Sequence, residues 1–404
     1  MSFLGATGIR LKDFVAQRVI FSLLSRLAVG KVHVELPGGA IRLFDSGNPG
    51  PEAVIQIHDT SFFRTFLTGG EIGFGEAYQQ EMWGSPDIVT LLSLAIENRQ
   101  AIDFDKGLTK FLSRRKNLQL HRTRINTIEG SKKNIHAHYD LGNDFFKIFL
   151  DNTMTYSSAV FKTESQSLEE AQTNKFRNLC ELANLVESDR LLEIGSGWGG
   201  FAIYAAKTYG CHVTTITISK EQFYLAKERI ETAGLDKLVD IQLIDYRELA
   251  GEYDKIVSIE MFEAVGVEYF ETFFQKCSSL LKPNGRLIMQ VITVPDRAFQ
   301  AQKVGINWIQ QYIFPGGVLP SLAEIERVNT RAGLVLDSSY DIGPDYGLTL
   351  RRWREAFWLK INTVRDQGYD DYFIKTWDYY LAACEAGFRT RITGDVHVAF
   401  DKAH

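Results

Sequence analysis

The chain has 404 residues, of which 45% are hydrophobic and 24% charged, with a formal net charge of -5 at pH 7. This length suits two domains, and the acidic balance argues against general nucleic-acid binding. Four cysteines lie apart without CxxC spacing, which argues against a disulfide framework or zinc site and favours a cytoplasmic protein. No apolar run approaches the roughly 20 residues that span a bilayer, so any membrane contact is expected to be peripheral.

Residues 1–104 are predicted to form a small α+β domain. An amphipathic helix is expected over residues 11–29, and packing against its own domain is favoured over lying on a membrane surface. Its apolar stripe consists of Leu11, Phe14, Val15, Val19, Leu23 and Leu27. Alternating residues predict a hairpin over 31–44 and a strand over 53–57, and an apolar run predicts a helix over 88–96.

A basic stretch, residues 105–133, follows and is predicted to be a linker. It carries nine Lys and Arg side chains, with Asp105 and Glu129 as nearby acids. A solvated linker is the ordinary explanation of such a run. Attraction to anionic lipid head groups is the alternative, because each nearby basic side chain contributes about 1 kcal/mol at a charged membrane surface.

Residues 134–404 are predicted to form an α/β domain of the doubly wound type, with a mostly parallel seven-stranded sheet. Near its start, His136 and His138 lack metal-ligand spacing, so hydrogen-bonding roles are favoured and no metal site is predicted. Strands are expected at 191–194, 212–218, 239–243, 255–259 and 285–292, helices at 169–185, 219–233 and 269–281, and a closing antiparallel pair at 334–341 and 396–400.

The first strand of this domain runs into Gly195-Ser196-Gly197-Trp198-Gly199-Gly200. A strand, a glycine turn and a helix N-terminus form a cradle for a nucleotide cofactor. The turn contains GxGxxG, so a nicotinamide oxidoreductase is one alternative. The second strand, however, ends in Thr217-Ile218-Ser219 without the acid that binds a dinucleotide ribose. Glu193 in the first strand and Asp245 after the third favour S-adenosylmethionine (SAM) instead.

Several motifs in order resemble the cyclopropane fatty acid synthase family of SAM-dependent enzymes. They are His138-Tyr139-Asp140-Leu141-Gly142-Asn143-Asp144-Phe145-Phe146, Thr155-Tyr156-Ser157-Ser158-Ala159-Val160-Phe161, Leu192-Glu193-Ile194-Gly195-Ser196-Gly197-Trp198-Gly199, Thr217-Ile218-Ser219-Lys220-Glu221-Gln222, Met261-Phe262-Glu263-Ala264-Val265-Gly266 and Tyr312-Ile313-Phe314-Pro315-Gly316-Gly317. The match extends from about residue 134 to the C-terminus, and residues 73–83 resemble the N-terminal domain of the longer members. This implies the Rossmann-like fold of class I SAM-dependent methyltransferases.

The resemblance implies a SAM-dependent C-methyltransferase acting on the double bond of unsaturated acyl chains in membrane phospholipids. The implied SAM-binding residues are Tyr156, Ser157, Gly195, Gly197, Thr217, Ile218, Gln222, Asp245 and Tyr246. An alkene held in line with the sulfonium methyl can attack it. Aromatic faces can then stabilise the resulting carbocation, and the aromatic-rich C-terminal half supplies candidates. A base must finally remove a proton from the new methyl group to close a cyclopropane ring.

In this family the base is a bicarbonate ion held by a Cys, a Glu, a His, a Tyr and a backbone group. Glu263 and Tyr346 stand at the Glu and Tyr positions, and Ile292 stands at the backbone position. Ser158 replaces the Cys and Gln290 replaces the His. Both replacements retain hydrogen-bonding capacity, so an anion can still be held, and the ring-closing step is the one that they affect.

The first expectation is therefore a peripheral enzyme at the inner face of the membrane that forms cyclopropane rings, with a homodimer as an open expectation. A methyl- or methylene-branched chain is the alternative product if ring closure fails. A lipid- or SAM-binding homologue with impaired catalysis is a further alternative, because Ser158 and Gln290 depart from the family pattern.

Overall fold

The computed structural model describes residues 3–102, 141–303 and 305–402, without the side chains of residues 3–10. The predicted linker at 105–133 and the histidines His136 and His138 lie outside these ranges. The chain divides into two compact units. The first comprises residues 1–123, 305–313 and 368–392, and the second comprises 124–304, 314–367 and 393–404. Two C-terminal segments thus join the N-terminal unit, and the domain boundaries expected at 104 and 134 stay predictions.

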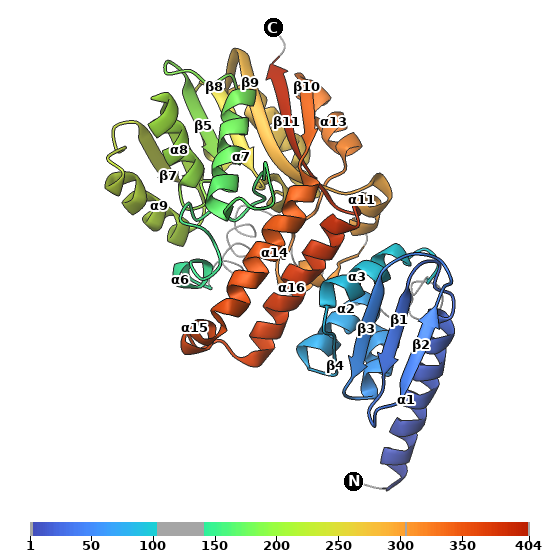
Figure 1. Ribbon diagram of the computed structural model, residues 1–404. Helices are drawn as coiled ribbons and strands as arrows, with labels where there is room; N and C mark the ends of the chain where they lie inside the picture. The colour runs from blue at the N-terminus through green and yellow to red at the C-terminus, as the bar shows by residue number, and fades with distance from the viewer. Residues whose placement is uncertain (1–2, 103–140, 304, 403–404) are drawn as a thin grey trace. The chain divides into compact units, whose positions relative to one another are not determined.

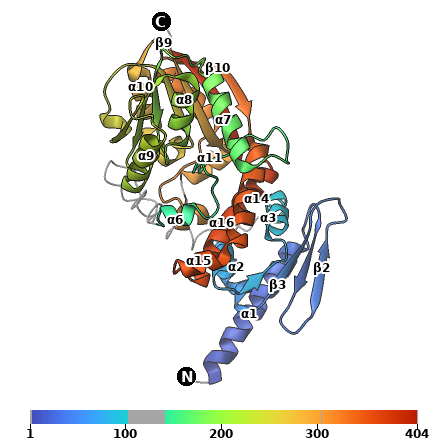
Figure 2. The same ribbon diagram turned by 60° about the vertical axis from the view of Figure 1, so that its left-hand side comes forward.

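The first unit contains a four-stranded sheet in the order β2-β1-β3-β4. Its strands are β1 (Lys31–Glu35), β2 (Ile41–Asp45), β3 (Glu52–Ile57) and β4 (Trp83–Gly84), and its helices are α1 (Phe3–Leu24), α2 (Ser61–Gln79), α3 (Ile88–Glu97), α12 (Trp308–Tyr312) and α16 (Asp371–Arg389). The β1–β2 hairpin is antiparallel, as the alternating sequence predicts, whereas β1 and β3 are parallel. The blue elements in Figure 2 show this sheet and α1.

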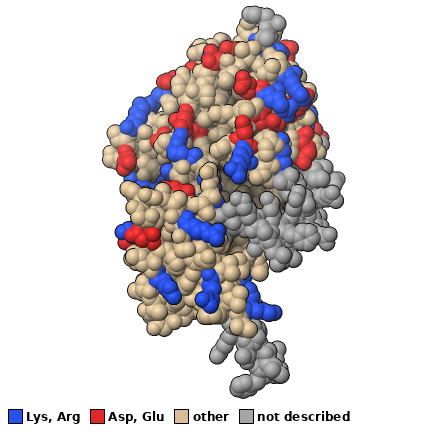
Figure 3. Space-filling view, turned by 90° about the vertical axis from the view of Figure 1, so that its right-hand side faces the viewer, with Lys and Arg blue, Asp and Glu red and all other residues tan. Residues whose placement is uncertain are grey.

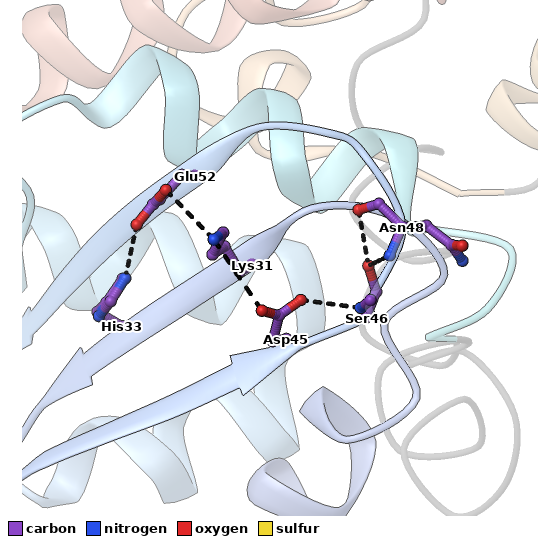
Figure 4. Close-up of polar contacts among 7 residues, drawn as sticks. Lys31, His33, Asp45, Ser46, Asn48 and Glu52 are labelled. Carbon is purple, nitrogen blue, oxygen red and sulfur yellow. Dashed lines mark hydrogen bonds and ion pairs between the residues drawn. The ribbon is translucent and has the colours of Figure 1, made fainter.

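Exposed ion pairs link the start of β1 to its two neighbouring strands in the sheet of the first unit (Figure 4). Lys31 Nζ lies 4.0 Å from Asp45 Oδ2 and 3.6 Å from Glu52 Oε2, its partners on the two flanking strands. His33 Nε2 contacts Glu52 Oε1 at 2.9 Å, and this hydrogen bond together with Lys31 lowers the pKa of Glu52. Exposed ion pairs contribute little stability. The two pairs of Lys31 join residues that face one another in the strand register, and we assign none of these contacts a catalytic or binding role.

The predicted apolar stripe of helix α1 is not the face that packs against the rest of the unit. The helix buries Asp13, Ala16 and Ile20, on a different face from the expected one. Four stripe residues, Leu11, Phe14, Val15 and Val19, are 39–64% exposed. The helix does pack on its own unit, where Phe21 contacts Phe44 and Phe63, but it leaves an apolar row in solvent.

The C-terminal helix α16 joins the first unit through buried polar contacts. Tyr78 Oη donates to Asp378 Oδ2 at 2.6 Å, and Gln79 Nε2 donates to Thr376 Oγ1 at 2.8 Å. Gly75 explains part of the motif at 73–83, because a Cβ there would lie 2.5 Å from the Trp308 ring. Only glycine allows the indole to approach α2 this closely.

The second unit contains a seven-stranded sheet in the order β10-β11-β9-β8-β5-β6-β7 (Figure 1). The strands are β5 (Arg190–Ile194), β6 (His212–Thr217), β7 (Val239–Leu243), β8 (Tyr253–Ile259), β9 (Leu281–Thr293), β10 (Leu334–Asp341) and β11 (Gly394–Lys402). The five strands β5–β9 pair in parallel, and β11 pairs antiparallel with both β9 and β10. This confirms the predicted mostly parallel sheet with a closing antiparallel pair.

Two hydrophobic cores cover the faces of this sheet. One joins α7 (Leu168–Leu182), α8 (Gly200–Tyr209) and α9 (Lys220–Thr232), and the other joins α10 (Phe270–Leu280) and α13 (Leu322–Arg331). The remaining elements are α6 (Asn143–Phe146), α11 (Asp296–Gln302), α14 (Gly343–Leu359), α15 (Ile361–Asp366) and the short helices η1 (Tyr246–Glu248), η2 (Phe262–Ala264) and η3 (Val267–Tyr269). Among the described residues, no helix has both the length and the apolar character required to traverse a bilayer.

Candidate active site

The glycine turn between β5 and α8 has the backbone of a cofactor cradle. Gly195, Gly197 and Gly199 have φ values of 98°, 48° and 83°, which favour glycine. A Cβ on Gly195 would lie 3.0 Å from Met261 Cγ. The amides of Gly195 and Ser196 donate to the Ile216 carbonyl at 3.0 and 2.8 Å. The turn is therefore held against β6, and Gly195, Gly197 and Gly199 lack a Cβ, which fits a backbone that approaches a nucleotide cofactor.

The loop after β6 presents a second group of predicted cofactor residues. Thr217 Oγ1 donates to Gln222 Oε1 at 2.9 Å and accepts the Ser219 amide at 3.1 Å. Ser219 caps α9, because its side chain accepts the Gln222 amide. Ile218 is half-buried between them. The structure thus brings Thr217, Ile218 and Gln222 together beside the glycine turn, whose residues bond to the end of the same strand.

The loop after β7 contributes an ion pair. Asp245 accepts two hydrogen bonds from the Arg247 guanidinium at 2.8 and 2.7 Å, and it is 3% exposed. The Tyr246 ring packs against Phe273 in the hydrophobic core, with centroids 5.4 Å apart, and its hydroxyl has no partner among the described residues. The side chain of Tyr246 therefore serves packing, and its cofactor contact stays a prediction.

Tyr156 and Ser157 lie on the segment between α6 and α7. The Tyr156 ring lies 5.2 Å from those of Phe146 and Trp353. Ser157 is buried, and its Oγ accepts a 2.6 Å hydrogen bond from Lys175 Nζ. Lys175 is fully buried, and burial lowers its pKa to about 8.

The centre of the site is Glu260, a residue that the sequence analysis missed. It follows β8 directly and has a φ of 45°, a strained value for a residue other than glycine. Its Oε1 accepts the Ser158 amide at 2.7 Å and Gln290 Nε2 at 2.6 Å. Its Oε2 accepts the Tyr346 hydroxyl at 2.6 Å. The predicted Ser158, Gln290 and Tyr346 therefore converge, and the group on which they converge is the Glu260 carboxylate.

Sheet register explains this convergence. The Glu260 amide donates to the Gln290 carbonyl at 2.9 Å, which extends the pairing of β8 with β9. On the other side of β9, Gln290 faces His397 and Ile292 faces Asp395. His397 Nε2 lies 3.2 Å from Gln290 Oε1, and since that oxygen only accepts, Nε2 carries the proton. The amide group of Gln290 is thereby turned toward Glu260 and Asp395, 2.9 Å from Asp395 Oδ2.

Glu263 lies on η2, one turn beyond Glu260. Its Oε1 accepts the Ile292 amide at 2.6 Å, and its buried Oε2 has no partner among the described residues. Two predicted residues, Glu263 and Ile292, are therefore in contact. Ser158 differs from expectation in that its hydroxyl donates to the Ala159 carbonyl at 3.0 Å, so its backbone amide faces the centre.

Burial dominates the electrostatics of this centre. It raises the pKa of Glu193 and of Glu263 to about 8. It also raises the pKa of Glu260 and, together with the charge of Glu260, that of Asp395. Burial lowers the pKa of His397 to about 3, so this histidine is neutral. Carboxyl groups thus outnumber cations, and a carboxyl group of this centre that is ionised can stabilise positive charge or accept a proton.

The comparisons with known proteins agree on one family. The family model described as mycolic acid cyclopropane synthetase matches residues 127–398. Tuberculostearic acid methyltransferase UfaA1 of Mycobacterium tuberculosis is 37% identical over 80% of this chain and 76% of its own length. Cyclopropane-fatty-acyl-phospholipid synthase of Escherichia coli is 36% identical over 85% of this chain and 86% of its own.

A solved structure agrees with them. Mycolic acid cyclopropane synthase CmaA1, complexed with SAH and CTAB, aligns with a TM-score of 0.63 and 27% identity. The alignment covers 67% of this chain and 98% of CmaA1. The seven-stranded unit therefore has the Rossmann-like fold of class I SAM-dependent methyltransferases, as the sequence analysis expected.

Proposed function

The chain belongs to the mycolic acid cyclopropane synthetase family, and from this membership we propose that it methylates the double bond of unsaturated acyl chains in membrane phospholipids. It is a SAM-dependent methyltransferase, and this replaces the nicotinamide alternative. The observation that carries the proposal for the chemistry is the buried centre of Glu260, Gln290 and Tyr346. Attack by an alkene leaves positive charge on the acyl chain, and a buried carboxylate stabilises such charge.

The proposed SAM site is the glycine cradle with its neighbours on β6 and β7. Gly195 and Gly197 let the backbone approach the cofactor, and Thr217, Ile218 and Gln222 line the adjacent loop. Tyr156, Ser157, Asp245 and Tyr246 complete the predicted set. When bound, SAM supplies the electrophilic methyl group. The proposed tasks of the chain are to hold the alkene in line with that methyl and to manage the proton released later.

The aromatic groups near Glu260 are suited to a carbocation. Trp353 on α14 lies 6.2 Å from the Tyr346 ring and 5.2 Å from the Tyr156 ring. Its indole nitrogen is buried without a partner among the described residues. We propose that Tyr156 and Trp353 present ring faces to the charged acyl chain, where cation–π attraction is strongest once water is excluded.

Cyclopropane formation is the first candidate product, and a methyl- or methylene-branched chain is the second. Ser158 and Gln290 stand in place of the Cys and the His, and both donate hydrogen bonds to Glu260. This difference from the family pattern is the reason for retaining the branched chain as the second candidate product. The impaired-homologue alternative is weaker, because the Ser158 amide, the Gln290 side chain and the Tyr346 hydroxyl all donate to the Glu260 carboxylate. Bicarbonate is not part of this proposal.

We further propose that the enzyme meets its substrate at the inner surface of the membrane. The support comes from α1, where Leu11, Phe14, Val15 and Val19 are exposed and Arg18 lies beside Phe14. Figure 3 shows Lys and Arg side chains set among uncharged residues on the N-terminal unit, in the lower part of the view. An apolar row flanked by cations suits an anionic interface. Cytoplasmic location and a homodimer stay predictions.

A direct assay tests the proposed function. Purified protein is incubated with SAM and vesicles of dioleoyl phosphatidylglycerol, with vesicles of the saturated dimyristoyl lipid as the control. We expect S-adenosylhomocysteine to form only with the unsaturated lipid and the released acyl esters to gain one CH2 unit. Equal S-adenosylhomocysteine release with both lipids, or none with either, would contradict the proposal.

A further inference from the structure

We propose that Glu260 is the base of this reaction, a carboxylate built into the chain at the position that the family resemblance assigns to a bound bicarbonate ion. The inference rests on the proposed function. It adds that the enzyme needs no bicarbonate, and it names a residue that the family motifs do not mark.

The hydrogen-bond donors around the centre carry the inference. The resemblance assigns bicarbonate to the positions of Ser158, Glu263, Gln290, Tyr346 and Ile292, and all of these except Glu263 supply hydrogen-bond donors. In the structure the Ser158 amide, the Gln290 amide group and the Tyr346 hydroxyl all donate to Glu260, at 2.6–2.7 Å. The Ile292 amide donates to Glu263. Each donor that would hold the ion already has a carboxylate of the chain as its acceptor.

Charge gives an independent argument. A bound bicarbonate would lie beside the Glu260 carboxylate, which already accepts the three donors, and two like charges at such a separation disfavour one another strongly in a buried site. Lys175 is a fully buried cation whose charge lowers the pKa of Glu260, and its Nζ donates to Ser157 Oγ at 2.6 Å. The residues present therefore do not fit an added anion.

Glu260 is also held in a strained backbone conformation. Its left-handed φ of 45° costs free energy that glycine would avoid. Such strain persists where surrounding contacts over-determine the position, and it clusters at functional sites. The Gln290 amide is itself oriented by neutral His397 on β11. His397 is thus a positioning residue, which acts through Gln290.

The alkene π pair forms a C–C bond to the methyl group, and the S–C bond breaks with its electron pair left on sulfur. The acyl chain then carries a carbocation. Glu260 removes a proton from the new methyl group, and the C–H electron pair closes the cyclopropane ring. For an exocyclic double bond, a hydride first shifts from the methylated carbon to the neighbouring cationic carbon, and the methyl C–H pair then forms the C=CH2 bond as Glu260 takes the proton. The proton leaves Glu260 for solvent before the next turnover, so the net products are the modified lipid, S-adenosylhomocysteine and one proton.

Two variants of Glu260 separate a base from a structural group. Glu260→Gln keeps the volume but cannot accept the proton, and we expect kcat to fall by about 100-fold or more with the KM for SAM within about threefold. Glu260→Gly suits the left-handed backbone and opens the site. For this variant we expect a similar loss and an at least tenfold recovery by added sodium bicarbonate. Glu252→Gln, an exposed glutamate of the same unit, is the control and should match the wild type.

The deciding measurement is wild-type turnover on dioleoyl phosphatidylglycerol vesicles in carbon-dioxide-free buffer, with and without added bicarbonate. Equal rates, together with rescue confined to Glu260→Gly, support the inference. Activity that requires bicarbonate in the wild type overturns it and leaves the proposed function intact. Full activity of a folded Glu260→Gln protein, checked by circular dichroism, also overturns it. Absence of product under both conditions contradicts the proposed function, and the inference with it.

Discussion

Lys175 sets the charge balance of the active centre. It is fully buried, donates to Ser157, and its ammonium interacts with Glu193, Glu260 and Asp395. Burial raises the pKa of each of these carboxyls, and the Lys175 charge opposes the rise for Glu193 and Glu260. A buried cation without any carboxylate would be costly, and so would the carboxylates without the cation. The two kinds of group therefore depend on one another.

Lys175→Met tests this dependence. Removing the ammonium raises the pKa of Glu260 further, because burial then acts without its opposing charge. We expect the acidic limb of the kcat/KM profile against pH to move to higher pH. Lys207→Met, at an exposed position on α8, is the matched control. A profile that stays in place, in a protein that still binds SAM, would show that Lys175 has no electrostatic role.

Glu263 makes stability depend on pH. Burial raises its pKa from 4.5 to about 8, so the folded state holds a proton that the unfolded state releases above about pH 4.5. The stabilisation is complete below pH 4.5 and is lost as pH rises toward 8. Glu263→Gln should remove a slope of up to about 1.4 kcal/mol per pH unit from the free energy of unfolding. Urea titrations between about pH 5 and 8 measure it, and an unchanged slope would refute the assignment.

At the scale of elements, the strands of the second unit could be predicted because buried parallel strands are short apolar runs bounded by turns. Helix α2 could not be predicted, because Gly69, Gly70, Gly73 and Gly75 disfavour a helix. In the structure the helix forms and is kinked at Gly70. Glu260 could not be found either. Its partners lie 102, 30 and 86 residues away, and only the pairing of β8, β9 and β11 brings them together. A lone acid at the carboxyl end of a parallel strand was the available signal.

The turn between β5 and α8 gives a prediction at this scale. Gly195→Ala places a Cβ 3.0 Å from Met261 Cγ at a φ of 98°. We expect a loss of about 1–3 kcal/mol in stability and at least a tenfold weaker Kd for SAM, measured by calorimetry. Gly234→Ala is the control, because it has a similar φ of 68° and open space around it. Equal SAM affinity in the two variants would remove the turn from the cofactor site.

At the scale of the whole molecule, the exposed apolar row on α1 of the first unit is the proposed membrane contact. The Phe14→Glu/Val15→Glu double variant should bind dioleoyl phosphatidylglycerol vesicles at least about 100-fold more weakly, because each buried apolar side chain contributes roughly 1.5–3 kcal/mol and two are lost. Val335→Glu, an exposed valine on β10, is the matched control. Co-sedimentation measures the binding, and raised salt should weaken it in all variants. Unchanged binding by the double variant would exclude α1 as the contact.

The central claim is that the methyl carbon of SAM is added to an acyl double bond and that a base then removes a proton from it. SAM carrying a trideuterated methyl group tests this directly on dioleoyl phosphatidylglycerol vesicles, with mass spectrometry of the released acyl esters. Ring closure or an exocyclic methylene predicts products that retain two of the three deuteriums. Retention of all three would place the proton loss on the acyl chain, and no label in the acyl chain would contradict the account.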